Sequence, residues 1–121
     1  MASHQFFDRV QETTSSPGTG NVSLAGAVSQ YVTFNSTFGL NNQFYYTIAD
    51  TSGTNWEVGE GHLSASTTLV RDNVLASSNS GSLVNFSSGT QAVWNDISAM
   101  SMNIAPTFSQ LYAIKCGYAL Q

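Results

Sequence analysis

The chain has 121 residues, which is the usual size of one domain and leaves no room for a second independent core. Its formal net charge is -4 and it has only three Lys and Arg residues, too few for the basic stripe that nucleic-acid binding requires. Only 8% of the residues are charged, against roughly 25% in a typical soluble domain. A surface with so little charge repels its neighbours weakly, which favours close association with other subunits.

The sequence also argues against membrane insertion and export. No apolar run reaches the roughly 18 residues that a spanning helix needs, so we expect no membrane contact. The opening MASHQFFDRV lacks the basic segment and the apolar core of a secretory signal, which predicts synthesis in a cytosol without export by that route. Cys116 is the single cysteine, so no disulfide can form within one chain and stability must come from packing or from partner subunits.

From Phe6 to about Val93, short runs rich in β-branched and aromatic residues alternate with clusters of Gly, Asn, Asp and Ser at intervals of about ten residues. This spacing predicts an all-β domain, either an antiparallel β-sandwich or a compact barrel, with roughly seven to nine short strands. Helical periodicity is absent from this region, so we expect no helix there. The predicted strands are 6–14, 21–28, 31–34, 44–50, 55–64, 67–75 and 83–86.

Alternating side chains support several of these strands. Val22 and Leu24 share one face of the second strand, and Phe44, Tyr46 and Ile48 share one face of the fourth. The first strand has mixed faces, which indicates an edge strand or a contact with another molecule. A hairpin is predicted at the last of three marked turns, which are Ser16-Pro17-Gly18, Asn41-Asn42 and Asp50-Thr51-Ser52-Gly53.

Three segments can be distinguished along the chain: an N-terminal tail at 1–5, a β domain at 6–94, and a C-terminal extension or closing element of the same domain at 95–121. The character of the sequence changes after the β domain. Asn95 and Asp96 are suited to cap a short helix through Met102, and Pro106 would stop it.

The segment from Phe108 to Leu120 is apolar and fits two roles. It is compatible with a closing strand of the same sheet, and equally with an arm that docks on a neighbour. The pattern does not separate these two roles. Tyr112 and Tyr118 in this segment are candidate interface residues.

No combination of residues meets the requirements of catalysis, so we expect no enzyme and no cofactor. Glu57 and Glu60 lie beside Trp56, an arrangement similar to glycosidase carboxylates. Residues 57 and 60 of an extended strand point to opposite faces, however, which favours two solvated strand carboxylates. No serine lies in a nucleophile elbow, and no glycine-rich loop carries a phosphate-binding lysine.

Metal binding has equally little support. His4 and His62 lack any spacing that would place both on one metal, and Cys116 is far from either in sequence. We therefore expect no metal site, with His4 in the terminal tail and His62 on a strand.

Five aromatic residues leave a binding alternative open. A carbohydrate-binding module would need several of them exposed as a stacking platform for sugars. Core packing explains most of them equally well, because large aromatic side chains are mostly buried. The five residues are Tyr31, Tyr45, Tyr46, Trp56 and Trp94.

The order of motifs along the chain is distinctive. The motifs are FFDRV at 6–10, ETT at 12–14, GTGNVSLAGAV at 18–28, FYYTI at 44–48, NWEVGEG at 55–61, TTLVR at 67–71 and VLASSNSG at 74–81. This series resembles a surface module of tailed-bacteriophage virion proteins, of the capsid-decoration or head- and tail-fibre type, which reads F-x-D-R-V-x-E-T-T and then G-T-G-x-x-x-L-x-G-A.

The resemblance covers about residues 6–86 and implies a non-enzymatic structural protein of the virion, made in the host bacterial cytoplasm. Because no long shaft or receptor-binding head follows, we expect a capsid decoration or cement protein that stabilises the head. The alternatives are a tail-fibre or tail-adaptor subunit and a carbohydrate-binding receptor-recognition module. The expected partners are the major capsid protein or other virion proteins, and further copies of the chain, with a trimer favoured.

Side-chain size and charge suggest roles for the shared residues. Around Gly59 and Gly61, residues with large side chains alternate with glycines, which have none. This would let a neighbouring strand or ring approach closely. Arg9 and Arg71 are expected to pair with carboxylates such as Asp8, Glu12, Glu57 or Asp72, and a buried pair would fix register more than add stability. The candidate structural and interface residues are Arg9, Glu12, Trp56, Gly59, Gly61, Arg71, Trp94, Tyr112 and Tyr118.

Overall fold

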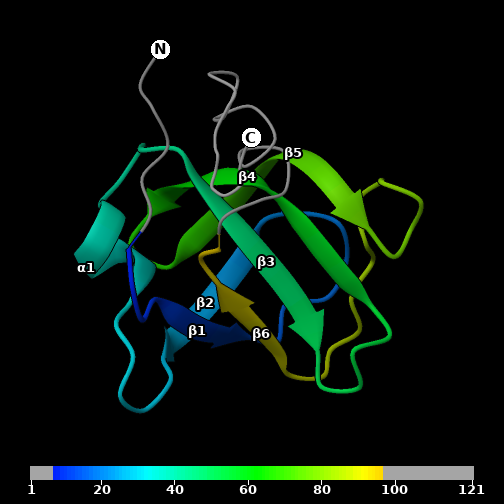
Figure 1. Cartoon of the computed structure of the whole chain (residues 1–121), viewed down its shortest axis with the longest axis horizontal. Helices are drawn as coiled ribbons and strands as arrows, with labels where there is room; N and C mark the ends of the chain where they lie inside the picture. Colours follow the sequence, from blue (N-terminus) through cyan, green and yellow to red (C-terminus); the bar gives the residue numbers. More distant parts are fainter. Residues whose placement is uncertain (1–6, 97–121) are drawn as a thin grey trace, which may run out of the picture.

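A computed structural model describes residues 7–96, which fold into a closed barrel of antiparallel strands (Figure 1). The N-terminal tail expected at 1–5 and most of the extension expected at 95–121 lie outside these residues. Around the barrel the strands follow the order β1-β2-β5-β4-β3-β6, and β6 pairs with β1. The elements are β1 (Gln11–Thr14), β2 (Val22–Ala27), α1 (Phe34–Phe38), β3 (Phe44–Asp50), β4 (Trp56–Ala65), β5 (Thr68–Ser77) and β6 (Gln91–Trp94).

The compact all-β class predicted from the sequence is confirmed, with fewer strands among the described residues than the roughly seven to nine expected. Two predicted strands are wrong. The segment 31–34 leads into helix α1, and 83–86 is a loop in which Phe86 forms an isolated bridge with Gly18. Strand β6, drawn in yellow between β1 and β3, falls where no strand is expected (Figure 1).

Helix α1 is short and is held at both ends. The side chain of Thr33 accepts a hydrogen bond from the backbone N–H of Ser36, which caps the first turn. Gly39, with a φ of 72°, ends the helix and donates its N–H to the carbonyl of Asn35. Phe34 and Phe38 lie four residues apart on the buried face. A single pair at this spacing is too short a pattern to reveal a helix in the sequence.

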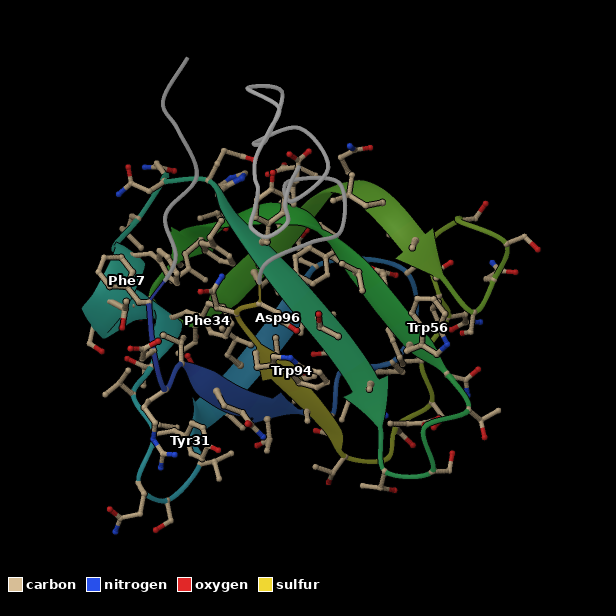
Figure 2. All side chains as sticks on the ribbon, in the orientation of Figure 1. Phe7, Tyr31, Phe34, Trp56, Trp94 and Asp96 are labelled. Atoms are coloured by element: carbon tan, nitrogen blue, oxygen red, sulfur yellow. The ribbon has the colours of Figure 1, made fainter. Side chains whose placement is uncertain are left out.

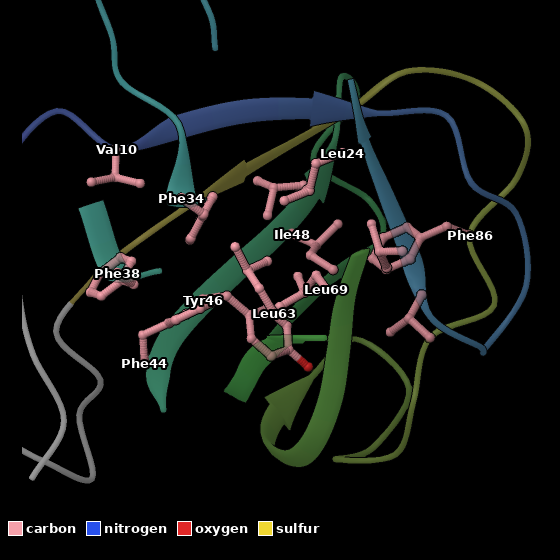
Figure 3. Close-up of a cluster of buried hydrophobic side chains, with 13 residues drawn as sticks. Val10, Leu24, Phe34, Phe38, Phe44, Tyr46, Ile48, Leu63, Leu69 and Phe86 are labelled. Carbon is pink, nitrogen blue, oxygen red and sulfur yellow. The ribbon is translucent and has the colours of Figure 1, made fainter. Parts of the chain in front are cut away.

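The inward side chains of the strands fill the barrel (Figure 3). Phe34 and Phe38 of α1 cover one end, with their ring centroids 5.0 and 4.7 Å from the ring of Phe44. Because side chains pack the interior, a ligand would have to bind on the outside. The core residues are Val10, Val22, Leu24, Phe34, Phe38, Phe44, Tyr46, Ile48, Leu63, Leu69, Val84, Phe86 and Val93.

Strand β1 is not the edge strand that its mixed faces indicated. It pairs with β2 on one side and with β6 on the other, and it is shorter than the strand predicted at 6–14. Its inward residues Glu12 and Thr14 are polar and buried, which explains why its apolar alternation is weak. Closure of the barrel pairs β1 on both sides, so the strand presents no free edge.

Gly59 and Gly61 allow the ring of Tyr46 to lie against β4. A Cβ atom at Gly59 would lie 2.6 Å from the hydroxyl oxygen of Tyr46 and 2.6 Å from the carbonyl oxygen of Asn73. A Cβ atom at Gly61 would overlap the carbonyl oxygen of Val70 on the paired strand β5. The close approach of a ring and a strand that the sequence predicts at these glycines is confirmed.

The variant Gly61→Ala is expected to lower the free energy of unfolding by about 1–3 kcal/mol, because its methyl group would push β5 away from β4. Urea denaturation measures the change. Gly89→Ala is the matched control, since a Cβ there meets its nearest atom, the Ser87 hydroxyl oxygen, at an ordinary 3.8 Å. The control should stay within about 0.5 kcal/mol of the parent chain. Equal stability of the two variants would contradict the packing described here.

Candidate functional site

Glu57 is a buried carboxylate at the centre of a hydrogen-bond network. Its side chain points from β4 into the barrel and is 0% exposed. Oε2 accepts a hydrogen bond from the Tyr46 hydroxyl at 2.6 Å. Oε1 accepts from the Arg71 guanidinium at 3.0 Å and from the backbone N–H of Val84 at 2.8 Å. Both carboxylate oxygens are therefore satisfied without water.

Arg71 joins this carboxylate to two loops. Its side chain is 2% exposed, and the pairing with Glu57 predicted from the sequence is confirmed. The remaining donors reach backbone carbonyls: that of Gly18 at 3.0 Å, that of Gly20 at 3.0 and 2.8 Å, and that of Val84 at 3.2 Å. Arginine suits this position because its planar head carries five donors in a fixed arrangement.

The network lies where the pairing between β2 and β5 ends early. The register between β2 and β5 covers two pairs, Val22 with Leu69 and Ser23 with Thr68, although β5 continues beside β4 as far as Ser77. The loop 15–21 and the loop 78–90 meet beyond this point, at the bridge between Gly18 and Phe86. Arg71 donates hydrogen bonds to backbone carbonyls of both loops. It therefore connects the two loops in the part of the barrel wall where β2 and β5 are not paired.

Tyr46 is held as a neutral donor. Burial, reinforced by the hydrogen bond to Glu57 and by the charge of that carboxylate, raises the pKa of Tyr46 well above its ordinary range. The hydroxyl therefore remains protonated while the carboxylate beside it is charged. The Tyr46, Glu57 and Arg71 side chains are buried, so the group is arranged to support the fold rather than to meet a substrate.

Glu12 is a second buried carboxylate, and it connects β1 with β2 and α1. Its Oε1 accepts from the backbone N–H of Gly26 at 3.1 Å, and its Oε2 accepts from the backbone N–H of Phe34 at 2.8 Å. Phe34 begins α1, so the carboxylate satisfies an N–H that the helix itself leaves unpaired. The expected pairing of Glu12 with an arginine is replaced by these backbone donors.

The predicted ion pair of Arg9 is wrong. Among residues 7–96, its guanidinium donates to the carbonyl of Gln30 at 3.3 and 2.9 Å and lies 4.1 Å from the centre of the Tyr31 ring. These contacts fix the loop after β2 at an exposed position. A carbonyl and a ring supplied by the neighbouring loop satisfy the cation there, so no carboxylate is required.

The other polar candidates do not form a catalytic or metal-binding group. Glu57 points inward, whereas Glu60 points outward and accepts from the Asn73 amide at 3.1 Å. His62 lies on β4, and its Nδ1 is 2.6 Å from the Asp72 carboxylate. In the part of the chain that the structure describes, no group of three or more His, Cys, Asp and Glu residues could hold a metal ion.

Several sequence candidates lie outside the described residues. They are the tail residue His4, the apolar segment 108–120 with Tyr112 and Tyr118, the helix expected before Pro106, and Cys116.

The outer side of β6, β3 and β4 carries both tryptophans (Figure 2). Trp56 on β4 is 37% exposed, and Trp94 on β6 is half-buried, on the other side of β3. The residues between them are small or uncharged. We call this surface the tryptophan face and define it as Trp56, Ala49, Ala92, Trp94, Thr47 and Val58.

Sequence reasoning identifies the two tryptophans but not the rest of the face. Ala49 and Ala92 become neighbours through the pairing of β3 with β6, two strands far apart in the chain. Because the sequence does not predict strand β6, it gives no indication of how β6 pairs with β3. The buried partners of Arg71 in the two loops are missed for a similar reason, since they are backbone carbonyls.

Comparison of the chain with protein-family models, with curated proteins and with solved structures finds no match in any of the three. Within residues 7–96, the structure contains no helix of the length and apolar character that crossing a bilayer requires.

The variant Arg71→Ala should lower the free energy of unfolding by about 3–5 kcal/mol, because it leaves the Glu57 charge buried without its cation. Chemical denaturation provides the measurement. Arg9→Ala is the matched control, since it removes an exposed guanidinium with one carbonyl and one ring contact, and should cost about 1 kcal/mol or less. Losses of the same size for both arginines would refute the role assigned to the buried pair.

The variant Tyr46→Phe should cost about 1–3 kcal/mol near pH 8, because Oε2 of Glu57 loses its buried donor. This deficit should shrink above about pH 10, the ordinary pKa of tyrosine. In the parent chain the unfolded state then ionises Tyr46 while the folded state keeps it protonated, so folding loses stability as the pH rises. The slope for one proton is about 1.4 kcal/mol per pH unit. Denaturation of both chains between about pH 8 and pH 11 checks this, and a deficit that does not change with pH would count against it.

Proposed function

We propose that this chain is a non-enzymatic structural subunit of a tailed-phage particle, and that it acts as a decoration or cement protein on the capsid. The observation that carries the proposal is the order of its motifs, from FFDRV at 6–10 to VLASSNSG at 74–81. The proposed partners are the major capsid protein or other virion proteins, together with further copies of this chain.

The positions of the motif residues in the barrel support a structural role. Tyr46 comes from FYYTI, Glu57 from NWEVGEG and Arg71 from TTLVR, and these three side chains form one buried network. Gly18 and Gly20 of the GTG motif supply carbonyls to the same guanidinium. Residues that serve one buried network are what a repeated structural module needs, whereas an enzyme needs its distinctive residues in an accessible cleft.

The surface composition is consistent with permanent association. Three cations and seven acidic residues are spread over 121 residues, so the polar surface consists mostly of hydroxyl and amide groups. Such groups can be covered by a neighbouring subunit at modest cost when they are hydrogen-bonded. Many weak contacts of this kind add up over the copies of a repeated lattice.

The exposure of the aromatic residues favours this role over carbohydrate recognition. Of the five aromatics considered for a sugar platform, Tyr45 and Tyr46 are buried, while Tyr31 and Trp94 are half-buried. Trp56 alone among these five reaches 37% exposure. A stacking platform requires several rings presented together, and one exposed ring does not supply it.

The location and copy number of the chain in purified particles test the proposal. Particles of a phage that encodes the chain would be analysed by cryo-EM and by quantitative mass spectrometry, with the major capsid protein as the internal standard. Hundreds of copies on the capsid lattice are the expected result. A handful of copies at the tail would assign the chain to a fibre or adaptor instead. A chain that co-purifies no better than a host cytosolic protein would contradict a place in the virion.

A further inference from the structure

We propose that the surface around helix α1 is the docking site for the apolar segment 108–120 of the same polypeptide. This surface, which we call the α1 patch, consists of Phe7, Val32 and Leu40. The inference goes beyond the proposed function, because it assigns an occupant to one surface of the barrel and does not depend on a place in a particle. Three observations carry it: the exposure of the patch, the point at which the chain leaves the barrel, and the distribution of charge.

The α1 patch contains the most exposed large apolar side chains of residues 7–96. Phe7, Val32 and Leu40 are 46%, 43% and 46% exposed. Val32 and Leu40 lie just before and just after the two caps of α1, and the ring of Phe7 lies 5.3 Å from the ring of Phe38 in α1. Figure 2 shows Phe7 beside this helix. Single exposed apolar residues are common, but three that adjoin one short helix indicate a contact surface.

The segment 108–120 needs an apolar surface of this kind. Nearly half of its thirteen residues have large apolar side chains. Leaving them in water is unfavourable, because burial of apolar area is the main favourable term in folding and association. The large apolar residues are Phe108, Leu111, Tyr112, Ile114, Tyr118 and Leu120.

The closed barrel argues against a closing strand, which is the other role that the sequence allows for this segment. Each strand of the barrel already pairs with a neighbour on both sides. Where β2 and β5 stop pairing, the loops 15–21 and 78–90 meet at the bridge between Gly18 and Phe86. An added strand therefore has no free edge in the described barrel, and docking through side chains is the remaining role.

The chain leaves the barrel beside the α1 patch. Asn95 donates its backbone N–H to the carbonyl of Val10 at 3.3 Å, and its Oδ1 accepts from the backbone N–H of Phe7 at 3.2 Å. Residues 97–107 span at most about 40 Å when fully extended, so the segment that follows them is tethered within reach of the patch. A short tether gives an effective concentration in the millimolar range, which favours the segment of the same chain over that of another copy.

Charge also selects this occupant. All seven Asp and Glu residues lie in 7–96, together with two of the three cations, and the third cation is Lys115. The barrel is therefore net negative and the segment 108–120 is net positive, so the two attract each other. Asp8, which is exposed, directly follows Phe7 at the border of the patch. A second barrel would bring the same negative charge and would be repelled.

Cys116 is the single cysteine and allows a direct test in the full-length chain. A nitroxide spin label attached to Cys116 broadens the NMR signals of nearby amides. The amides of Phe7, Val32 and Leu40 should lose most of their intensity and recover it when the nitroxide is reduced. The amide of Gly53, in the turn at the far end of β3, should keep its intensity. Strongest broadening at the Gly53 end of the barrel would overturn the proposal.

A measurement without the label covers the case in which the label itself prevents docking. In the unmodified chain, nuclear Overhauser contacts should join the methyl groups of Val32 and Leu40 to aromatic rings of the segment 108–120. If neither these contacts nor the broadening is found, the segment does not bind the α1 patch and the proposal is rejected.

Two substitutions in the spin-labelled chain locate the contact. Leu40→Ser removes an apolar side chain from the patch and should restore most of the signal at Phe7 and Val32. Leu83→Ser is the matched control, because Leu83 is also exposed but lies in the loop 78–90, and it should leave the broadening unchanged. Circular dichroism establishes that both variants are folded. Equal effects of the two substitutions would contradict docking on the α1 patch.

A mixed sample separates docking within one chain from docking between copies. It combines spin-labelled chain without ¹⁵N and ¹⁵N-enriched Cys116→Ser chain without the label, and the enriched chain should show no broadening. Broadening at its α1 patch would overturn docking within one chain and identify an exchanged arm. These measurements use the isolated chain, so their outcome is separate from the presence or absence of the chain in particles.

Discussion

The buried pair of Glu57 and Arg71 is the constraint on which the rest of the barrel depends. Removing two charges from water is costly, and a well-packed apolar pair can be as stable. The cost is offset here because every carboxylate oxygen and most guanidinium donors find partners at hydrogen-bond distance. An apolar pair would not hold the loop carbonyls of Gly18 and Gly20. The ion pair thus determines how the loops meet where β2 and β5 stop pairing, which the apolar core alone would leave undefined.

Glu12 solves a similar problem at the other end of the barrel. Its two oxygens bind the backbone N–H groups of Gly26 and Phe34, so β1 holds both β2 and the start of α1. Apolar side chains supply most of the free energy of folding, since they remove the largest area from water. The buried carboxylates instead decide where a loop or a helix attaches, because each bond requires a particular donor at a particular place. Three charged side chains, Glu12, Glu57 and Arg71, are thus used inside the barrel.

The parts of this structure that could be predicted are those with a long local pattern. The strand at 44–50 is predicted correctly because Phe44, Tyr46 and Ile48 share one face before a marked turn, and the strand predicted at 21–28 follows the same logic. Helix α1 and strand β6 span five and four residues, too few for a period to be distinguished. Arg71 could be assigned a carboxylate because cations are scarce, but the same reasoning failed for Arg9, which the adjacent loop satisfies. The tryptophan face depends on the closure of the barrel, which no local pattern records.

Glu57 and Tyr46 lie on the inner side of β4 and β3, and the outer side of the same two strands carries part of the tryptophan face. Side chains alternate along a strand, so the register that turns Glu57 and Tyr46 inward also turns Trp56 and Thr47 outward. A slip of one residue would bury Trp56 and expose Glu57, and the carboxylate would lose its cation. The ion pair therefore penalises the wrong register and fixes the positions of the rings on the outside.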